Sequence, residues 1–158
     1  MHLFRRTIEI TISDAGKGTF ILHTNLTDMY HDIVLQLHVS VPDYIVTDAA
    51  VEMKRIPHLG CREVYEQMAK LVGNEVGKGF TKVVLDALGG KGGCPNMVNL
   101  VLLSAPLAIN AAAVLKQQRE NLTDAEMDLV WQDVLGGVCL AYPKEGKREQ
   151  KQHEKEAK

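Results

Sequence analysis

The N-terminal part of the chain alternates between apolar and polar side chains, which is the pattern of β-strands with one buried face. This alternation runs over residues 4–13, 19–24 and 32–40, and residues 45–53 fit a fourth strand. A polar break is expected over residues 25–28. Successive strands joined by short connections predict an antiparallel meander that leaves one face in contact with water.

After Pro57 the apolar residues recur at every third or fourth position, the spacing of one face of an amphipathic helix. The spacing predicts helices over residues 61–72 and 80–88, each followed by glycine. Residues 94–118 form the most apolar stretch and predict a buried central helix with a kink at Pro106. Polar residues interrupt this stretch, which argues against a membrane span because unpartnered amides are costly in hydrocarbon.

The region after residue 121 begins with a helix start signal, since Thr123 can cap and Glu126 can close a capping box. Residues 144–158 are charged and almost without apolar side chains, so we expect a disordered tail. This order of elements predicts an α+β fold, with an N-terminal antiparallel meander of about four strands followed by about four helices. We expect a single domain over residues 1–143.

Composition narrows the class of protein. Hydrophobic residues make up 46% and charged residues 24% of the chain, as in ordinary globular proteins. The formal net charge is −2, and by difference residues 1–143 carry about −4, the wrong sign for a phosphate-binding surface. We therefore expect no nucleic-acid partner, and the polar residues within residues 94–118 predict no membrane partner. Three widely separated cysteines and the lack of a signal-peptide pattern favour a cytoplasmic protein with reduced thiols.

Two of the cysteines are candidates for chemistry. Cys61 and Cys94 each follow a glycine at the predicted start of a helix, where the helix dipole favours the thiolate. A thiolate can bind a metal or act as a nucleophile, and His58 could supply a third metal ligand. The alternative is that both thiols are small buried hydrophobic groups.

The glycine-rich loop over residues 89–93 precedes Cys94 and offers backbone N–H groups to an anionic ligand. Its candidate ligand-binding residues are Gly90, Gly92 and Gly93. It is not a Walker loop, because the Gly-Lys-Ser/Thr sequence is absent. The alternative is a plain connection that ends one helix before the next begins.

The remaining candidate groups are expected to be structural. Cys139 lies in an apolar segment and is expected to be packed. His23, His31 and His38 fall on predicted strands and are expected to be surface or ordinary hydrogen-bonded residues. The sequence identifies no catalytic triad or carboxylate pair, so it assigns no reaction.

The order of several short motifs resembles the bacterial family called domain of unknown function 2889, from about Arg5 to Ala113. The motifs are IVTDA at 45–49, PHLGC at 57–61, GKGF at 77–80 and GGKGGC at 89–94. In that family the second cysteine typically opens a Gly-Cys-Thr-His-Leu segment, whereas here Asn96 stands in the histidine position. If the family's histidine is a metal ligand, this protein has lost it, because an amide binds soft metals far less well.

A looser resemblance is to the NifU-like iron–sulfur scaffold proteins, which also place an antiparallel sheet before cysteines at helix starts. The scaffold's first cysteine is normally followed closely by an aspartate, whereas Arg62 and Glu63 follow Cys61 here. A middle cysteine is expected as well and is missing. The resemblance is one of fold, and fold alone assigns no function.

Three hypotheses about function remain open. The first is a non-enzymatic accessory that holds or transfers a metal, an iron–sulfur cluster or sulfur through Cys61 and Cys94, with His58 as a further ligand; its cofactor would be zinc or a cluster. The second is a small enzyme or ligand-binding module with a pocket between the sheet and the Cys94 helix. The third is an assembly subunit in which both cysteines are core residues. The partner would be another protein, a small ligand or a second copy of the chain.

Overall fold

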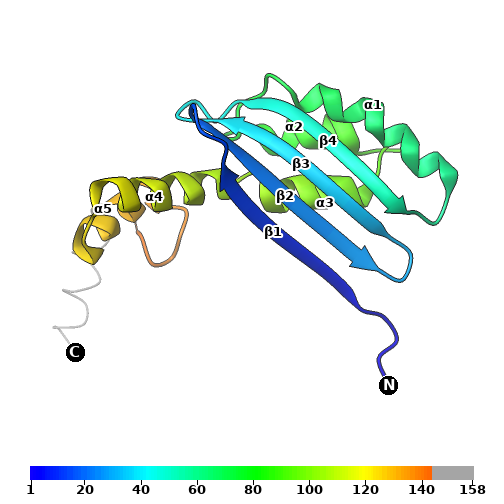
Figure 1. The fold of residues 1–158 in the computed structure, drawn as a ribbon, viewed down its shortest axis with the longest axis horizontal. Helices are drawn as coiled ribbons and strands as arrows, with labels where there is room; N and C mark the ends of the chain where they lie inside the picture. Colours follow the sequence, from blue (N-terminus) through cyan, green and yellow to red (C-terminus); the bar gives the residue numbers. More distant parts are fainter. Residues whose placement is uncertain (144–158) are drawn as a thin grey trace. The chain divides into compact units, whose positions relative to one another are not determined.

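The computed structural model describes residues 1–143, and the chain forms two compact units, residues 1–111 and the residues from 112 onward. The expected tail, residues 144–158, lies outside the described residues. The first unit contains a four-stranded antiparallel sheet in the order β1-β2-β3-β4 (Figure 1). Its strands are β1 (Arg6–Asp14), β2 (Thr19–Asp28), β3 (Asp32–Ser40) and β4 (Val46–Arg55). The predicted meander and the α+β class are confirmed.

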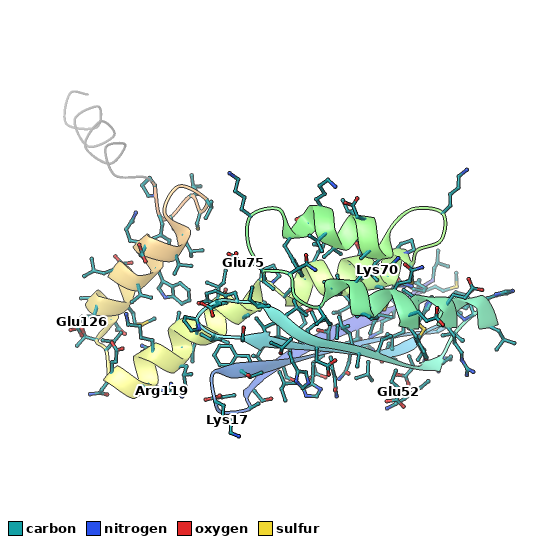
Figure 2. The ribbon with its side chains drawn as sticks, turned by 90° about the horizontal axis from the view of Figure 1, so that it is seen from above. Lys17, Glu52, Lys70, Glu75, Arg119 and Glu126 are labelled. Atoms are coloured by element: carbon teal, nitrogen blue, oxygen red, sulfur yellow. The ribbon has the colours of Figure 1, made fainter. Side chains whose placement is uncertain are left out.

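One face of the sheet is apolar and lies under the helices. On β2 and β3 every second residue is buried, which is the consequence of the period-two alternation in the sequence. The other face is polar and open. Figure 2 shows the two sides, with Lys70 on the helix side and Glu52 on β4 pointing away from the helices. The buried residues of β2 and β3 are Phe20, Leu22, Thr24, Leu26, Asp28, Ile33, Leu35, Leu37 and Val39.

The predicted polar break over residues 25–28 was wrong, because β2 continues to Asp28. Its backbone is paired with β1 on one side and β3 on the other through this segment. Asn25 and Thr27 are exposed, while Leu26 and Asp28 are buried. The alternation therefore continues, with a carboxylate in the last inward-facing position.

The helix predicted over residues 61–72 consists of three short pieces. They are η1 (Leu59–Glu63), α1 (Val64–Met68) and η2 (Ala69–Leu71), of which η1 and η2 are 3₁₀ turns. Its apolar stripe is nevertheless kept, because the side chains of Val64, Met68 and Leu71 are buried. The predicted helix over residues 80–88 is confirmed as α2 (Phe80–Leu88).

The predicted central helix is divided near Pro106. The structure has α3 (Pro95–Ser104) and α4 (Leu107–Glu120), separated by Ala105 and Pro106. Proline lacks the N–H that continues a helical hydrogen-bond ladder. The whole stretch from residue 95 to residue 120 is long and apolar enough to cross a membrane, a test that the core helix of a soluble protein also passes. In α3 the side chains of Met97, Leu100 and Val101 are fully buried.

The second unit contains α5 (Asp124–Leu135), whose start confirms the predicted capping box. The Thr123 side chain accepts from the Glu126 N–H at 3.4 Å, and the Thr123 N–H donates to the Glu126 carboxylate at 2.8 Å. The Thr123 N–H and hydroxyl lower the pKa of Glu126. Cys139 follows this helix and is half-buried.

Candidate functional site

A cavity of about 380 Å³ in the first unit gathers reactive side chains from three segments of the chain. These segments are the connection after β2, the turn that contains η1, and the loop that leads into α3. We call this cavity the thiol pocket. Its lining side chains with chemical function are those of His31, His58, Cys61, Glu63, Lys91, Cys94 and Asn96.

The thiol pocket contains most of the candidate residues expected from the sequence. Cys61 and Cys94 both line it and both are half-buried, and His58 lines it as well. Gly92 and Gly93 of the glycine-rich loop form part of its wall, whereas Gly90 is not among its lining residues. That the two sulfur atoms come within about 10 Å of each other stays a prediction.

Cys94 is positioned by the loop that connects α2 to α3. It is the N-cap residue of α3, with an extended backbone, and Pro95 occupies the first helical turn. The Cys94 N–H donates to the Leu88 carbonyl oxygen at 2.8 Å, which folds the loop back onto the end of α2. A Cβ atom on Gly93 would lie 2.0 Å from the same carbonyl oxygen, so only glycine fits there. The loop therefore holds the Cys94 thiol at a defined place.

Cys61 lies within the 3₁₀ turn η1, which begins after His58. The His58 Nδ1 atom accepts a hydrogen bond from the Gly60 N–H at 3.0 Å, and the Cys61 N–H donates to the His58 carbonyl oxygen at 3.0 Å. A neutral imidazole has one lone pair, so Nε2 of His58 carries the proton in this arrangement. His58 acts here as a helix cap, and to bind a metal through Nε2 its proton would have to move to Nδ1, which would break the hydrogen bond from the Gly60 N–H.

Asp28 is the fully buried centre of a hydrogen-bond network beside the pocket. Its side chain is 0% exposed, and Oδ1 accepts from the N–H groups of Tyr30 and His31, each at 2.8 Å. The Arg6 guanidinium donates to Oδ2 from Nε at 2.9 Å and from Nη2 at 2.6 Å. Burial by itself raises the pKa of this carboxyl, but the hydrogen bonds from Tyr30, Arg6 and His31 outweigh burial and hold the pKa well below its usual range.

The network continues from Asp28 through His31 to Asn96 at the start of α3. An ionised carboxylate only accepts, so His31 donates from Nδ1, which lies 3.1 Å from Asp28 Oδ1. The Nε2 atom of His31 then accepts from Asn96 Nδ2 at 3.2 Å. Arg6 Nη1 donates to Asn96 Oδ1 at 3.0 Å, which fixes the orientation of the amide. The side chains of Arg6, Asp28, His31 and Asn96 form a closed ring of hydrogen bonds. The ring connects β1 and the turn after β2 to the start of α3.

From the sequence, His31 is expected to be a surface or ordinary hydrogen-bonded residue on a strand, and neither Asp28 nor Arg6 is a candidate. His31 lies between β2 and β3, and it joins the pocket to the ring. A signal was present in the sequence, because Asp28 falls on the same face of β2 as Leu22 and Leu26. A buried charge requires a partner, and that requirement predicts an ion pair at this end of the sheet.

The described part of the chain, residues 1–143, contains no group of three or more His, Cys, Asp or Glu side chains that could hold a metal ion. In the same residues all three cysteines are free thiols. Metal binding by Cys61, Cys94 and His58 therefore stays a prediction, without a group of ligands arranged for it.

Comparison with known proteins gives one match. A family model described as "Protein of unknown function (DUF2889)" matches residues 4–110, in agreement with the resemblance seen in the sequence. No curated protein and no solved structure matches the chain, so the likeness to NifU-like scaffold proteins is not supported.

Proposed function

We propose that this chain, which belongs to the DUF2889 family, binds a small molecule in the thiol pocket and holds it against Cys61 and Cys94. The observation that carries the proposal is the composition of the cavity. Two thiols, two imidazoles and an ammonium group come together from segments that are far apart in the sequence. Small-molecule sites are concave and bring a few polar groups together from different segments.

The hydrogen bonds around the pocket favour sulfur as the group that meets the ligand. The lone pair of His58 is used by the Gly60 N–H, and that of His31 is used by Asn96. The two imidazoles are therefore engaged in hydrogen bonds within the walls of the pocket, whereas the half-buried thiols are free to meet a ligand. Thiols are soft nucleophiles, so the proposed ligand presents an electrophilic or otherwise soft atom to them.

The second candidate function is a non-enzymatic carrier of a metal, an iron–sulfur cluster or sulfur. One observation favours it, because Cys61 and Cys94 line the same cavity. A stable zinc or cluster site needs three or four ligands, and residues 1–143 offer no such group ready-made. We therefore place it second. The free thiols agree with the cytoplasmic location that we propose from the sequence.

Thiol labelling tests whether the two cysteines share a small-molecule site. Treated with excess monobromobimane, Cys139→Ser should take up one bimane per chain, because the first adduct fills the pocket and shields the second thiol. The matched control, Cys61→Ser, should take up two, on Cys94 and Cys139. Mass spectrometry reads both results. Two adducts on Cys139→Ser would show that the thiols react independently and would remove the basis of the proposal.

Zinc titration against a chelating dye, under reducing conditions, separates the two candidate functions. The ligand-binding proposal expects Cys61→Ser and Cys94→Ser to bind zinc as weakly as the unchanged protein. Tight binding of one zinc ion per chain, lost in each serine variant, would instead establish the metal carrier.

A further inference from the structure

β1 is a regular edge strand with little protection. Within the sheet of the first unit it has a single neighbour, β2, and it pairs with that neighbour without interruption from Arg6 to Asp14. It contains no proline and no bulge, and none of its nine residues is buried. Long edge strands without such interruptions present unpaired backbone groups to other chains.

The apolar side chains of β1 are only partly covered, although they lie on the helix side of the sheet. Ile8, Ile10 and Ile12 stand opposite inward-facing residues of β2. Ile8 is 37% exposed, and the other two are half-buried. β2 lies between β1 and the remaining strands (Figure 1). The three isoleucines of β1 therefore form the apolar margin of the sheet.

The opposite edge of the sheet, β4, shows how this fold protects a strand. Its pairing with β3 has register shifts near both ends, and α1 and η2 pack against it. Bulges, charges and covering helices are the usual means of preventing edge-to-edge pairing. β4 has all three, whereas β1 has charged residues but, in the described part of the chain, neither a bulge nor a helix that packs against it as α1 and η2 do against β4. The charged residues of β4 are Asp48, Glu52, Lys54 and Arg55.

We infer that β1 pairs with β1 of a second copy of this chain, antiparallel about a twofold axis at Ile10. In this register Ile10 faces its own symmetry mate, and Ile8 faces Ile12 of the other copy. A twofold interface must be self-complementary, and the row of three isoleucines is so about Ile10. The two four-stranded sheets then form one continuous sheet, and the exposed isoleucines are covered.

The open face of the same strand makes the register testable. There Glu9 of one copy stands opposite Thr11 of the other, and the contact occurs twice about the axis. Opposite charges facing each other across two strands stabilise the pairing, and like charges oppose it. Thr11 is exposed, so a charged residue of either sign can be placed there without disturbing the core.

Sedimentation equilibrium on the full chain tests the inference. The unchanged protein and Thr11→Lys should have a mass of twice 17.5 kDa, whereas Thr11→Glu should raise the dissociation constant by about tenfold. Ile10→Lys places two ammonium groups on the axis and should leave a monomer of 17.5 kDa. Thermal unfolding followed by circular dichroism checks that the variants fold.

Three results would overturn the inference. The first is a monomer at every concentration of the unchanged protein, which would mean that something other than a second copy covers β1 or that the edge is open. The second is an equal dissociation constant for Thr11→Glu and Thr11→Lys, which would exclude this register. The third is a dimer that Ile10→Lys leaves intact, which would place the interface elsewhere.

Discussion

A substitution of Asp28 tests how far this buried carboxylate stabilises the first unit, because it connects three parts of that unit. The variant Asp28→Asn keeps the size of the side chain and removes its charge. The Asn oxygen can still accept from the N–H groups of Tyr30 and His31. Its amide nitrogen, however, would face two donor groups of Arg6, which now bond to Oδ2. Two charge-assisted hydrogen bonds are then lost, and the N–H donors of Arg6 face the N–H donors of the Asn amide.

The magnitude follows from the burial of the two partners. Removal of one member of a buried ion pair lowers the free energy of unfolding by about 3–5 kcal/mol, because the other charge is left without a partner. The Arg6 side chain is 32% exposed, so water can partly solvate it in the variant. We therefore expect a loss of about 3 kcal/mol, at the lower end of that range.

The pH dependence has a definite sign. The pKa of Asp28 in the folded protein lies below its ordinary value of 3.8. The carboxylate therefore contributes stability that is fully present above about pH 4 and is lost as the pH falls through the folded pKa. Asp28→Asn lacks this contribution at every pH. The difference in stability between the two proteins should be largest near neutral pH and should shrink as the pH falls below 3.8.

Urea denaturation followed by far-UV circular dichroism at several pH values measures this difference. The matched control is Asp43→Asn, which changes an exposed carboxylate and should alter the free energy of unfolding by no more than about 0.5 kcal/mol. A loss below about 1 kcal/mol in Asp28→Asn, or a loss that does not change with pH, would refute the description of Asp28 as a buried, paired carboxylate.

Two further predictions concern the loop and the start of α3. Gly93→Ala should lower the free energy of unfolding by about 2 kcal/mol in a urea titration, because its Cβ would collide with the Leu88 carbonyl. Gly92→Ala should change this free energy little, because there is open space around Gly92. Equal effects of the two substitutions would contradict the close approach of Gly93 to the Leu88 carbonyl. Asn96→His should raise the affinity for zinc if Cys61 and Cys94 can serve as ligands, since imidazole binds zinc far better than an amide does. Equal, weak zinc binding by both proteins in a dye competition would count against any metal role for this loop.

The fold was largely predictable because its signals are local. Alternation along β1 and β3 and the helical spacing of α2 each depend on neighbours within one element. The predicted break after Thr24 was wrong because polar residues on the open face of β2 carry no penalty when both neighbouring strands pair with it. The composition of a segment does not reveal whether its backbone has partners on both sides.

The candidate site was predictable in part for the same reason. Cys94 and the glycine-rich loop can be recognised from a few neighbouring residues, and the thiol pocket includes Cys94 and part of the loop. The ring around Asp28 cannot be recognised in this way, since Arg6 and Asn96 are 90 positions apart in the sequence. No periodicity connects such a pair. Only the inward-facing place of a charged residue at the end of β2 indicated that a partner was required.

The ring also connects the stability of the sheet to the chemistry of the pocket. Asn96 lies two residues after Cys94, in the first turn of α3, and its amide is fixed by Arg6 on one side and His31 on the other. The start of α3, and with it the Cys94 thiol, is therefore held in place by a carboxylate buried at the end of β2. It follows that Asp28→Asn should change the rate at which monobromobimane reacts with Cys94 while leaving Cys139, in the second unit, unaffected. An unchanged rate at Cys94 in a folded variant would mean that the loop alone positions the thiol, through the Cys94 N–H and Gly93, and that the ring serves only the stability of the sheet.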